Sequence, residues 1–491
     1  MKIRIILAAI IVSGLSVQLA AQNPDDALRY SQQFYSGTAR FSSMGGAFTA
    51  LGGDLSSIGL NPAGTGIFRS FEFTFTPHFG YNKSFTYFTE NNGDFRYSFN
   101  LGQFGVVMPI IQTGSENGLV SLNFAYSYNM TNDFNANTVI RGTNSTSSMA
   151  DYWASISNGT HYTDLDGVAG MAYDAWVIDT ITGTGGMQYG TVFSQYGDAT
   201  GSTYGQTVRR VITNEGFSGE HSFSVAANYN NNLFAGVTLG LARFNYTGHY
   251  EHLETDPGDD IFDFNSFSYV DHYEANGTGF SLKAGLIYLP VEFLRVGLAV
   301  HTPTIYRVNE YYYEDLSSSF DDGDRYEFNT DAFRFDYRLI TPFRLMGGAA
   351  VQFQKLGLVS VDYELVDYSM ARFSKASDGY DYYGENESIG EIFTKAHNIR
   401  AGAEFRLGSL YFRGGYGYYG TVFSKSEINN DSFNTSISGG IGFRQSGFFF
   451  DMGFSSYSNS LKYYMYNHQN IDPVTIETTK NTFIATVGLK F

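Results

Sequence analysis

Residues 359–365 read Val-Ser-Val-Asp-Tyr-Glu-Leu, with an apolar side chain at every second position and a polar one between. Residues 399–406 repeat this pattern as Ile-Arg-Ala-Gly-Ala-Glu-Phe-Arg. Successive side chains of a strand point to opposite faces, so both stretches predict strands with one apolar and one charged face. A charge on a lipid-facing surface costs roughly 2–4 kcal/mol at the bilayer midplane. If these strands cross a membrane, their charges must face the lumen of a barrel.

The connections between such segments alternate in length. About fourteen strands are expected between residues 71 and 491. Tight links such as 230–232 and 354–356 alternate with long polar segments such as 131–217 and 304–339. Outer-membrane barrels have short periplasmic turns and long extracellular loops, whereas a soluble sandwich has no reason to sort its loops. We therefore expect an all-β, antiparallel transmembrane barrel of about 14 strands in the outer membrane of a Gram-negative bacterium.

The composition is consistent with this fold class. Charged residues make up only 16% of the chain, which contains 38 Tyr, 44 Phe and 55 Gly. A secreted β-sandwich or solenoid is the alternative for such a composition. The net charge of -18 argues against nucleic acid as a partner. Cysteine is absent, which excludes disulfides, thiolate chemistry and lipoprotein acylation.

Both ends of the chain carry export signals. Lys2 and Arg4 precede an apolar run, and small residues follow it up to Ala21, so residues 1–21 are expected to be a cleaved signal peptide. The segment 480–491 alternates and stops on Phe491. A last strand of this kind resembles the signal read by the barrel assembly machinery. Outer-membrane lipid and lipopolysaccharide are the other expected partners of the barrel surface.

Residues 22–70 are rich in Gly and Ser and do not alternate. The lumen of a fourteen-stranded barrel is too wide for wall side chains to fill, so this segment is expected to be a hatch inside it. The predicted organisation is therefore a signal peptide (1–21), a hatch (22–70) and a barrel (71–491). The hatch aromatics are candidates for its packed core or for a ligand-lining surface: Phe34, Tyr35, Phe41 and Phe48.

Two stretches carry a family resemblance. Residues 39–50 form a small-residue segment, followed by an Asp-x-Ser and by Asn-Pro-Ala-Gly just before the first strand. Thr302-Pro303, Thr341-Pro342 and Asp362-Tyr363-Glu364 lie further along. Together they resemble the FadL/TodX family of outer-membrane transport proteins, although the loop 131–217 is longer than that family leads us to expect. The hatch residues that match the family motif are Asp54, Ser56, Asn61, Pro62, Ala63 and Gly64.

The resemblance implies a passive transporter and not an enzyme. In that family a hydrophobic small molecule, such as a long-chain fatty acid, is captured at the extracellular loops. It then enters the barrel and leaves sideways through the wall. No cofactor and no metal are expected. Burial of each methylene contributes about 0.8 kcal/mol, so an amphipath can move between apolar cavities without crossing water.

Two other functions remain open. A haem-binding receptor of the same fold would use loop histidines such as His249, His252 or His272. A secretion-associated barrel of the PorV type would hold protein partners with its long loops, and 131–217 favours that idea. The acidic loop 247–276 has oxygen ligands suited to Ca²⁺, but its spacing matches no defined calcium loop, so a solvated loop is expected.

Overall fold

The computed structural model describes residues 23–193, 204–377, 379–466 and 471–491. The predicted signal peptide, residues 1–21, lies outside this part of the chain. Among the described residues, no helix combines the length and the apolar character needed to cross a bilayer.

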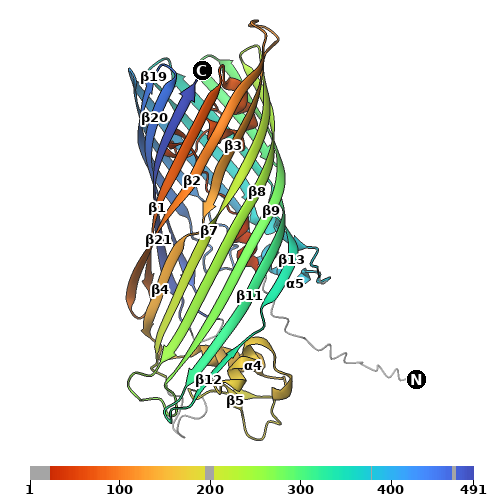
Figure 1. The fold of residues 1–491 in the computed structure, drawn as a ribbon, viewed down its shortest axis with the longest axis vertical. Helices are drawn as coiled ribbons and strands as arrows, with labels where there is room; N and C mark the ends of the chain where they lie inside the picture. Colours follow the sequence, from red (N-terminus) through yellow and green to blue (C-terminus); the bar gives the residue numbers. More distant parts are fainter. Residues whose placement is uncertain (1–22, 194–203, 378, 467–470) are drawn as a thin grey trace, which may run out of the picture.

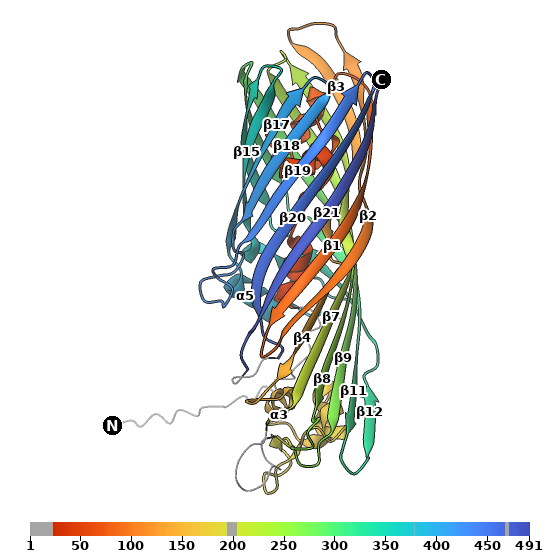
Figure 2. The same cartoon turned by 90° about the vertical axis from the view of Figure 1, so that its left-hand side faces the viewer.

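The described residues form one closed antiparallel barrel with 14 wall strands, which confirms the predicted fold class (Figures 1 and 2). The first and last strands close it, with Phe79 opposite Phe483 and Glu72 opposite Lys490. The wall strands, in order, are β1 (Glu72–Tyr87), β2 (Asn91–Gln112), β3 (Leu119–Asp133), β7 (Thr207–Tyr229), β8 (Leu233–Thr255), β9 (Ser266–Val291), β10 (Leu294–His301), β14 (Arg344–Phe353), β15 (Gly357–Asp367), β17 (Lys395–Leu407), β18 (Leu410–Tyr419), β19 (Asn434–Gln445), β20 (Phe448–Tyr463) and β21 (Val474–Lys490).

Two neighbouring wall strands are interrupted at the Thr-Pro segments. After the first break, β10 is followed by β11 (Ile305–Ser319). Before the second break, β13 (Phe333–Ile340) precedes β14. Proline has no N–H to give to the ladder, so pairing breaks at these points. Threonine hydroxyls replace the missing bonds: Thr341 Oγ1 accepts from Thr304 N at 2.9 Å, and Thr302 Oγ1 accepts from Leu282 N at 3.0 Å.

The two faces of the wall differ as the alternation predicts. Val359, Val361 and Tyr363 are exposed on the outside of β15, whereas Asp362 and Glu364 are buried toward the lumen. The other strands repeat this division, with Leu, Val, Ile and Phe side chains outside. The exterior therefore presents the apolar belt that a bilayer requires.

The long connections contain more structure than the sequence predicts. Short turns lie at the end of the barrel near the C-terminus, which we call the turn end, and longer connections lie at the opposite loop end (Figure 1). Strands such as β8 and β9 continue well into the segment 247–276, which was expected to be a loop. The further elements at the loop end are β4 (Ala136–Thr143), α3 (Met149–Ser157), η3 (Tyr162–Asp164), α4 (Gly167–Asp174), β5 (Asp179–Thr180), β6 (Tyr189–Gly190), β12 (Arg325–Asn329), η4 (Tyr368–Met370), β16 (Arg372–Ser374) and α5 (Tyr383–Ile392).

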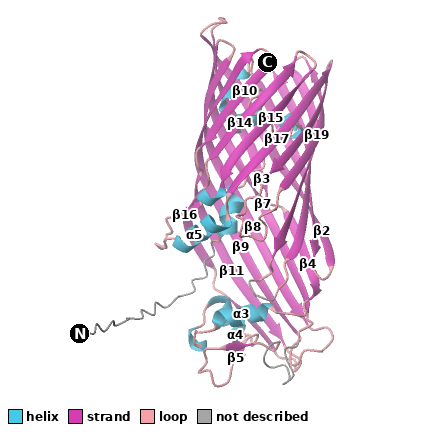
Figure 3. Ribbon diagram, turned by 180° about the vertical axis from the view of Figure 1, so that it is seen from behind, coloured by secondary structure: helices cyan, strands magenta, loops and turns pink. Residues whose placement is uncertain are grey.

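The described part of the segment 131–217, which excludes residues 194–203, is a folded insertion and not a plain loop. Its helices α3 and α4 pack against the far ends of the wall strands (Figure 3). Glu254 on β8 is fully buried there and accepts from Met149 N at 2.9 Å and from Ser148 Oγ at 2.7 Å. Trp153 packs 5.3 Å from Phe267 between ring centroids. The insertion therefore has an apolar core shared with the barrel wall.

The topology predicts that the loop end faces the cell exterior and the turn end faces the periplasm. Because the chain has no cysteine, a single introduced cysteine is a clean reporter. Asp322→Cys, in the connection between β11 and β12, should react with a membrane-impermeant maleimide on intact cells. Glu292→Cys, in the turn between β9 and β10, should react only after the outer membrane is permeabilised. If Glu292→Cys reacts on intact cells and Asp322→Cys does not, the orientation is the opposite of the one predicted.

Candidate functional site

The described part of the hatch lies inside the barrel as a series of short helical turns (Figure 2). They are α1 (Pro24–Ser31), α2 (Ala39–Ser43), η1 (Leu55–Gly59) and η2 (Pro62–Ile67). A polar side chain begins each turn by accepting a backbone N–H that has no partner within the helix. These capping residues are Asn23, Thr38, Asp54 and Asn61.

Asp54 and Ser56, from the predicted hatch motif, connect two of these turns. Thr38 Oγ1 donates to both carboxylate oxygens of Asp54, at 2.9 and 2.8 Å. Thr38 N donates to Ser56 Oγ at 2.8 Å. Because Thr38 also caps α2, the Asp-x-Ser pair joins the start of α2 to the start of η1.

Asn61 attaches the hatch to the wall. Its Nδ2 donates to the hatch carbonyl of Thr49 at 2.6 Å and to the wall carbonyls of Leu286 and Leu298 at 3.2 and 3.3 Å. Its backbone is extended, with φ -135° and ψ 106°, as a residue before proline requires. The neighbouring Ala63 is buried against Phe234. The asparagine amide therefore reaches two adjacent wall strands at once.

Gly64 does not have a positive φ, so a left-handed backbone is not the reason for a glycine at this position. A Cβ at this position would lie 3.0 Å from the Cα of Gly52 and 3.1 Å from Ser57 Oγ. Close packing of two backbone segments within the hatch is what requires the missing side chain.

The four candidate aromatics lie in two different places. Phe41 and Phe48 are buried in the hatch core with their ring centroids 5.1 Å apart. Phe34 and Tyr35 instead line the main cavity of the lumen. The Tyr35 hydroxyl donates to Glu364 Oε1 at 2.8 Å, and the Arg400 guanidinium lies 4.5 Å from the centre of its ring.

Buried charges of the wall hold the hatch in register. Arg40 of α2 pairs with Glu404 at 2.9 Å, and Thr49 donates through N and Oγ1 to Asp362 at 2.8 and 2.7 Å. Arg344 pairs with Glu364 at 3.0 Å and donates to the Ser31 carbonyl. A buried charge without a partner costs several kcal/mol, so these contacts favour one position of the hatch.

Sequence reasoning missed a set of wall glycines that make room for the hatch. A Cβ at Gly285 would lie 1.9 Å from Asn61 Oδ1, and one at Gly415 would lie 2.2 Å from Gly45 N. The signal in the sequence is a glycine at the inward-facing position of successive strands. Glycines at which a Cβ would lie under 3.0 Å from a hatch atom are Gly236, Gly285, Gly297, Gly402, Gly415, Gly440 and Gly453.

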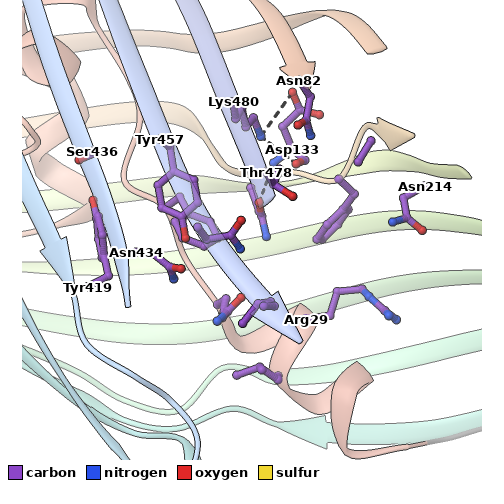
Figure 4. A pocket seen from close by; sticks show the side chains of 18 of the residues that line it. Arg29, Asn82, Asp133, Asn214, Tyr419, Asn434, Ser436, Tyr457, Thr478 and Lys480 are labelled. Atoms are coloured by element: carbon purple, nitrogen blue, oxygen red, sulfur yellow. Dashed lines mark hydrogen bonds and ion pairs between the residues drawn. The ribbon is translucent and has the colours of Figure 1, made fainter. Parts of the chain in front are cut away.

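The main cavity has a volume of about 600 Å³ and lies between the hatch and the strands at the loop end. One side is aromatic: Phe34 packs against Tyr457 and Tyr419, with ring centroids 4.8 and 6.1 Å apart. The side formed by β19 to β21 is polar, with residues such as Asn434, Ser436 and Thr478 (Figure 4). The cavity is therefore amphipathic and not uniformly apolar.

Two charged side chains at the cavity have carboxylate partners. Lys480 lies 3.6 Å from the Asp133 carboxylate and donates to its backbone carbonyl at 2.8 Å. Arg29 pairs with Asp26, whose pKa is raised to about 6 by burial although the guanidinium opposes this shift. The cavity therefore offers both donors and acceptors to a polar group.

The wall beside the cavity has a seam. Pairing between β2 and β3 stops at Gln103 and Asn129, and among the described residues Asn91–Leu101 of β2 pair only with β1. The chain after β3 continues as β4 on β7. Side chains of β1 instead donate to backbone carbonyls of the chain after β3. Asn82 Nδ2 donates to the Asn135 carbonyl at 2.9 Å, and Thr86 Oγ1 donates to the Val139 carbonyl at 2.7 Å. Cavity-lining residues at this seam include Asn82, Met130, Asp133, Phe134 and Ala136.

The candidate histidines do not meet in one site. His252 is buried, with Nε2 2.9 Å from Glu254 Oε1. His249 and His272 lie opposite each other on β8 and β9, with ring centroids 6.1 Å apart. In the described part of the chain, no group of three or more His, Cys, Asp or Glu side chains is arranged to hold a metal ion, the acidic segment 247–276 included.

Phe491 lies at the turn end. Its side chain is 76% exposed, its ring centroid lies 5.7 Å from that of Phe71, and its N–H donates to the Phe71 carbonyl at 3.0 Å. The last residue therefore contacts the segment where the hatch passes into β1.

No family model and no curated protein sequence matches this chain. Among solved structures, a FadL homologue from Pseudomonas aeruginosa matches at 11% identity with a TM-score of 0.54, over 94% of this chain and 100% of that one. The P. putida toluene transporter TodX matches at 11% identity and 0.53, over 93% and 99%. The Ralstonia pickettii toluene transporter TbuX matches at 14% identity and 0.50, over 93% and 99%. At these identities the likeness concerns architecture alone, and this chain has the fold of the FadL and TodX outer-membrane barrels.

Proposed function

We propose that this chain is a passive outer-membrane channel for hydrophobic small molecules, which leave the lumen sideways through the seam between β2 and β3. The observation that carries the proposal is the position of the main cavity, whose lining includes Met130 and Asp133, just beyond the last pair of the β2–β3 ladder, Gln103 with Asn129. The wall there is held by side chains and not by a backbone ladder. Side chains can change rotamer on a fast timescale, whereas opening a ladder breaks many bonds together.

The lining of the cavity supports an amphipathic ligand. Phe34, Tyr419 and Tyr457 offer apolar surface to a hydrocarbon chain, and the paired Lys480 and Asp133 offer donors and acceptors to a polar head. A volume of about 600 Å³ is within the usual range for a small-molecule site. Long-chain fatty acids have this combination of groups, and we propose them as the first ligands to test.

Capture is proposed to occur at the loop end. Large apolar side chains are exposed there: Trp176 of the folded insertion is 53% exposed, and Phe262, in the connection between β8 and β9, is 72% exposed. Trp176 also has a positive φ of 58°, which is unfavourable for a residue with a bulky side chain. Exposed apolar surface at the mouth would hold a hydrophobic molecule before it enters the lumen.

The same observation supports the second candidate function, a secretion-associated barrel that holds protein partners. The insertion shares an apolar core with the barrel wall around Trp153 and α4, and its exposed aromatics would suit a protein contact. Saturable uptake of a ligand would support transport, whereas a barrel that only holds protein partners should show no such uptake. Assembly through Phe491, and contact of the exterior with lipid and lipopolysaccharide, are further proposals that hold for either function.

Deleting residues 22–64 should separate the hatch from the barrel. We expect an assembled barrel, because each wall strand keeps its backbone partners, but saturable uptake of a long-chain fatty acid should be lost. A nonspecific leak to small solutes should appear, since a fourteen-stranded lumen is wide when empty. Radiolabelled uptake and liposome swelling measure the two effects. Intact saturable uptake, or failure to assemble, would contradict an independent barrel with a removable hatch.

Crosslinking the seam should block uptake. Ser98 Oγ and Asp133 Oδ2 lie 2.8 Å apart across it, so Ser98→Cys with Asp133→Cys can be joined by a short bifunctional thiol reagent. We expect treatment to remove most of the fatty-acid uptake that the double variant shows before crosslinking, and to leave the uptake of each single variant unchanged. The matched control is Thr435→Cys with Ser458→Cys, a pair within the continuous ladder of β19 and β20. Equal uptake before and after crosslinking of the seam would show that ligands do not leave there.

A further inference from the structure

A second cavity lies at the turn end of the lumen. Its volume is about 200 Å³, and Leu51, Gly52 and Ile67 of the hatch form part of its lining. Gln354 and Lys355, from the turn between β14 and β15, lie at it as well. We call it the turn-end pocket. Its lining includes Arg40 of the hatch and Glu404 of the wall, which pair with each other, and none of its described lining residues also lines the main cavity.

The charges of the turn-end pocket are strongly unbalanced. Glu404 is its single acidic lining residue, although the whole chain has 48 acidic and 30 basic residues. The clustering of positive charge is therefore a local feature and does not follow from composition. The basic lining residues are Arg40, Arg295, Lys355, Arg406 and Arg444.

The carboxylates near the pocket are already engaged. Glu404 Oε2 accepts from both Arg40 and Arg413, at 2.9 and 2.8 Å. Asp451 Oδ1 accepts from Arg413 at 2.6 Å, while Arg444 is 3.9 Å from the other oxygen of Asp451. Three guanidinium groups thus share two carboxylates. Arg295, Lys355 and Arg406 add positive charge that these two acids do not balance.

Arg295 and Arg444 have donors that lack partners. Arg295 Nη1 donates to the Leu51 carbonyl at 2.9 Å, but no carboxylate of the described residues forms an ion pair with this side chain. The Nε atoms of both Arg295 and Arg444 are buried without an acceptor among the described residues, although the Arg444 side chain as a whole is 34% exposed. A buried charged donor left unsatisfied is costly, and an anion in the pocket would relieve that cost.

We propose that the turn-end pocket binds a phosphate group, with Arg295 and Arg444 as its principal ligands. Planar guanidinium forks match the geometry of phosphate oxygens, and a dianion balances more of the excess charge than a single carboxylate does. The phosphate could belong to a free ion of the periplasm or to a lipid headgroup. This site is separate from the proposed transport pathway, and its test requires no uptake.

Titration calorimetry on the full-length protein in detergent tests the proposal, with inorganic phosphate and dihexanoyl phosphatidic acid as probes at low ionic strength. We expect binding that weakens as salt is added. Arg295→Gln combined with Arg444→Gln should weaken it at least about tenfold, because charge-assisted donors are replaced by amides. Binding of both probes indicates that the phosphate group suffices, whereas binding of the lipid alone assigns the site to a headgroup.

The matched control is Arg69→Gln, since Arg69 is an exposed arginine near the turn end that lies outside the pocket. It should bind both probes as the unchanged protein does. Heat-modifiable gel mobility checks that each variant is folded, and if the double variant fails this check, Arg444→Gln alone should show a smaller loss. Binding of neither probe would overturn the proposal. Equal affinity in the folded pocket variant and the Arg69→Gln control would also overturn it.

Discussion

The structure depends on one constraint, which is that a backbone N–H or C=O within hydrocarbon must find its partner inside the protein. Closing β1 onto β21 satisfies this for the wall as a whole. At the two Thr-Pro segments, threonine hydroxyls take the place of ladder bonds that proline prevents. At the seam, side chains of β1 such as Asn82 and Thr86 donate hydrogen bonds to backbone carbonyls of the chain after β3. The seam is therefore a closed but locally different part of the wall.

The width of the barrel creates the second requirement, because a lumen of this size needs a filling that wall side chains cannot supply. The hatch fits closely only where the wall has no side chain, as at Gly285 beside Asn61. The buried wall carboxylates of Asp362 and Glu404 accept hydrogen bonds from Thr49 and Arg40 of the hatch. Ion pairs of this kind add little net stability but disfavour every other placement of the segment.

Strand prediction succeeded within the apolar belt and failed beyond it for a physical reason. On β15 the lipid-facing side must be apolar and the lumen side can be charged, so the period of two is visible in the sequence. Where β8 and β9 pass out of the belt, as at His249 and His272, both faces can be polar and the alternation disappears. Those extensions were expected to be loops. The insertion 131–217 was likewise expected to be a loop. Its structure is not visible in the sequence because the capped helix α3 is short and because β9 residues such as Phe267 complete its core.

The sequence by itself determined the fold class, the inward direction of the charges and the presence of a segment that resembles a hatch motif, because each follows from local order along the chain. The tertiary structure alone decided how those parts meet. Phe34 lines the cavity while Phe41, seven positions later, is packed in the hatch core, and no local pattern separates them. The same holds for the seam, the wall glycines and the turn-end pocket. They arise where residues distant in the sequence come into contact, from 53 positions for Asn82 with Asn135 to 364 positions for Arg40 with Glu404, and such pairings are set by the closed barrel and not by neighbouring sequence.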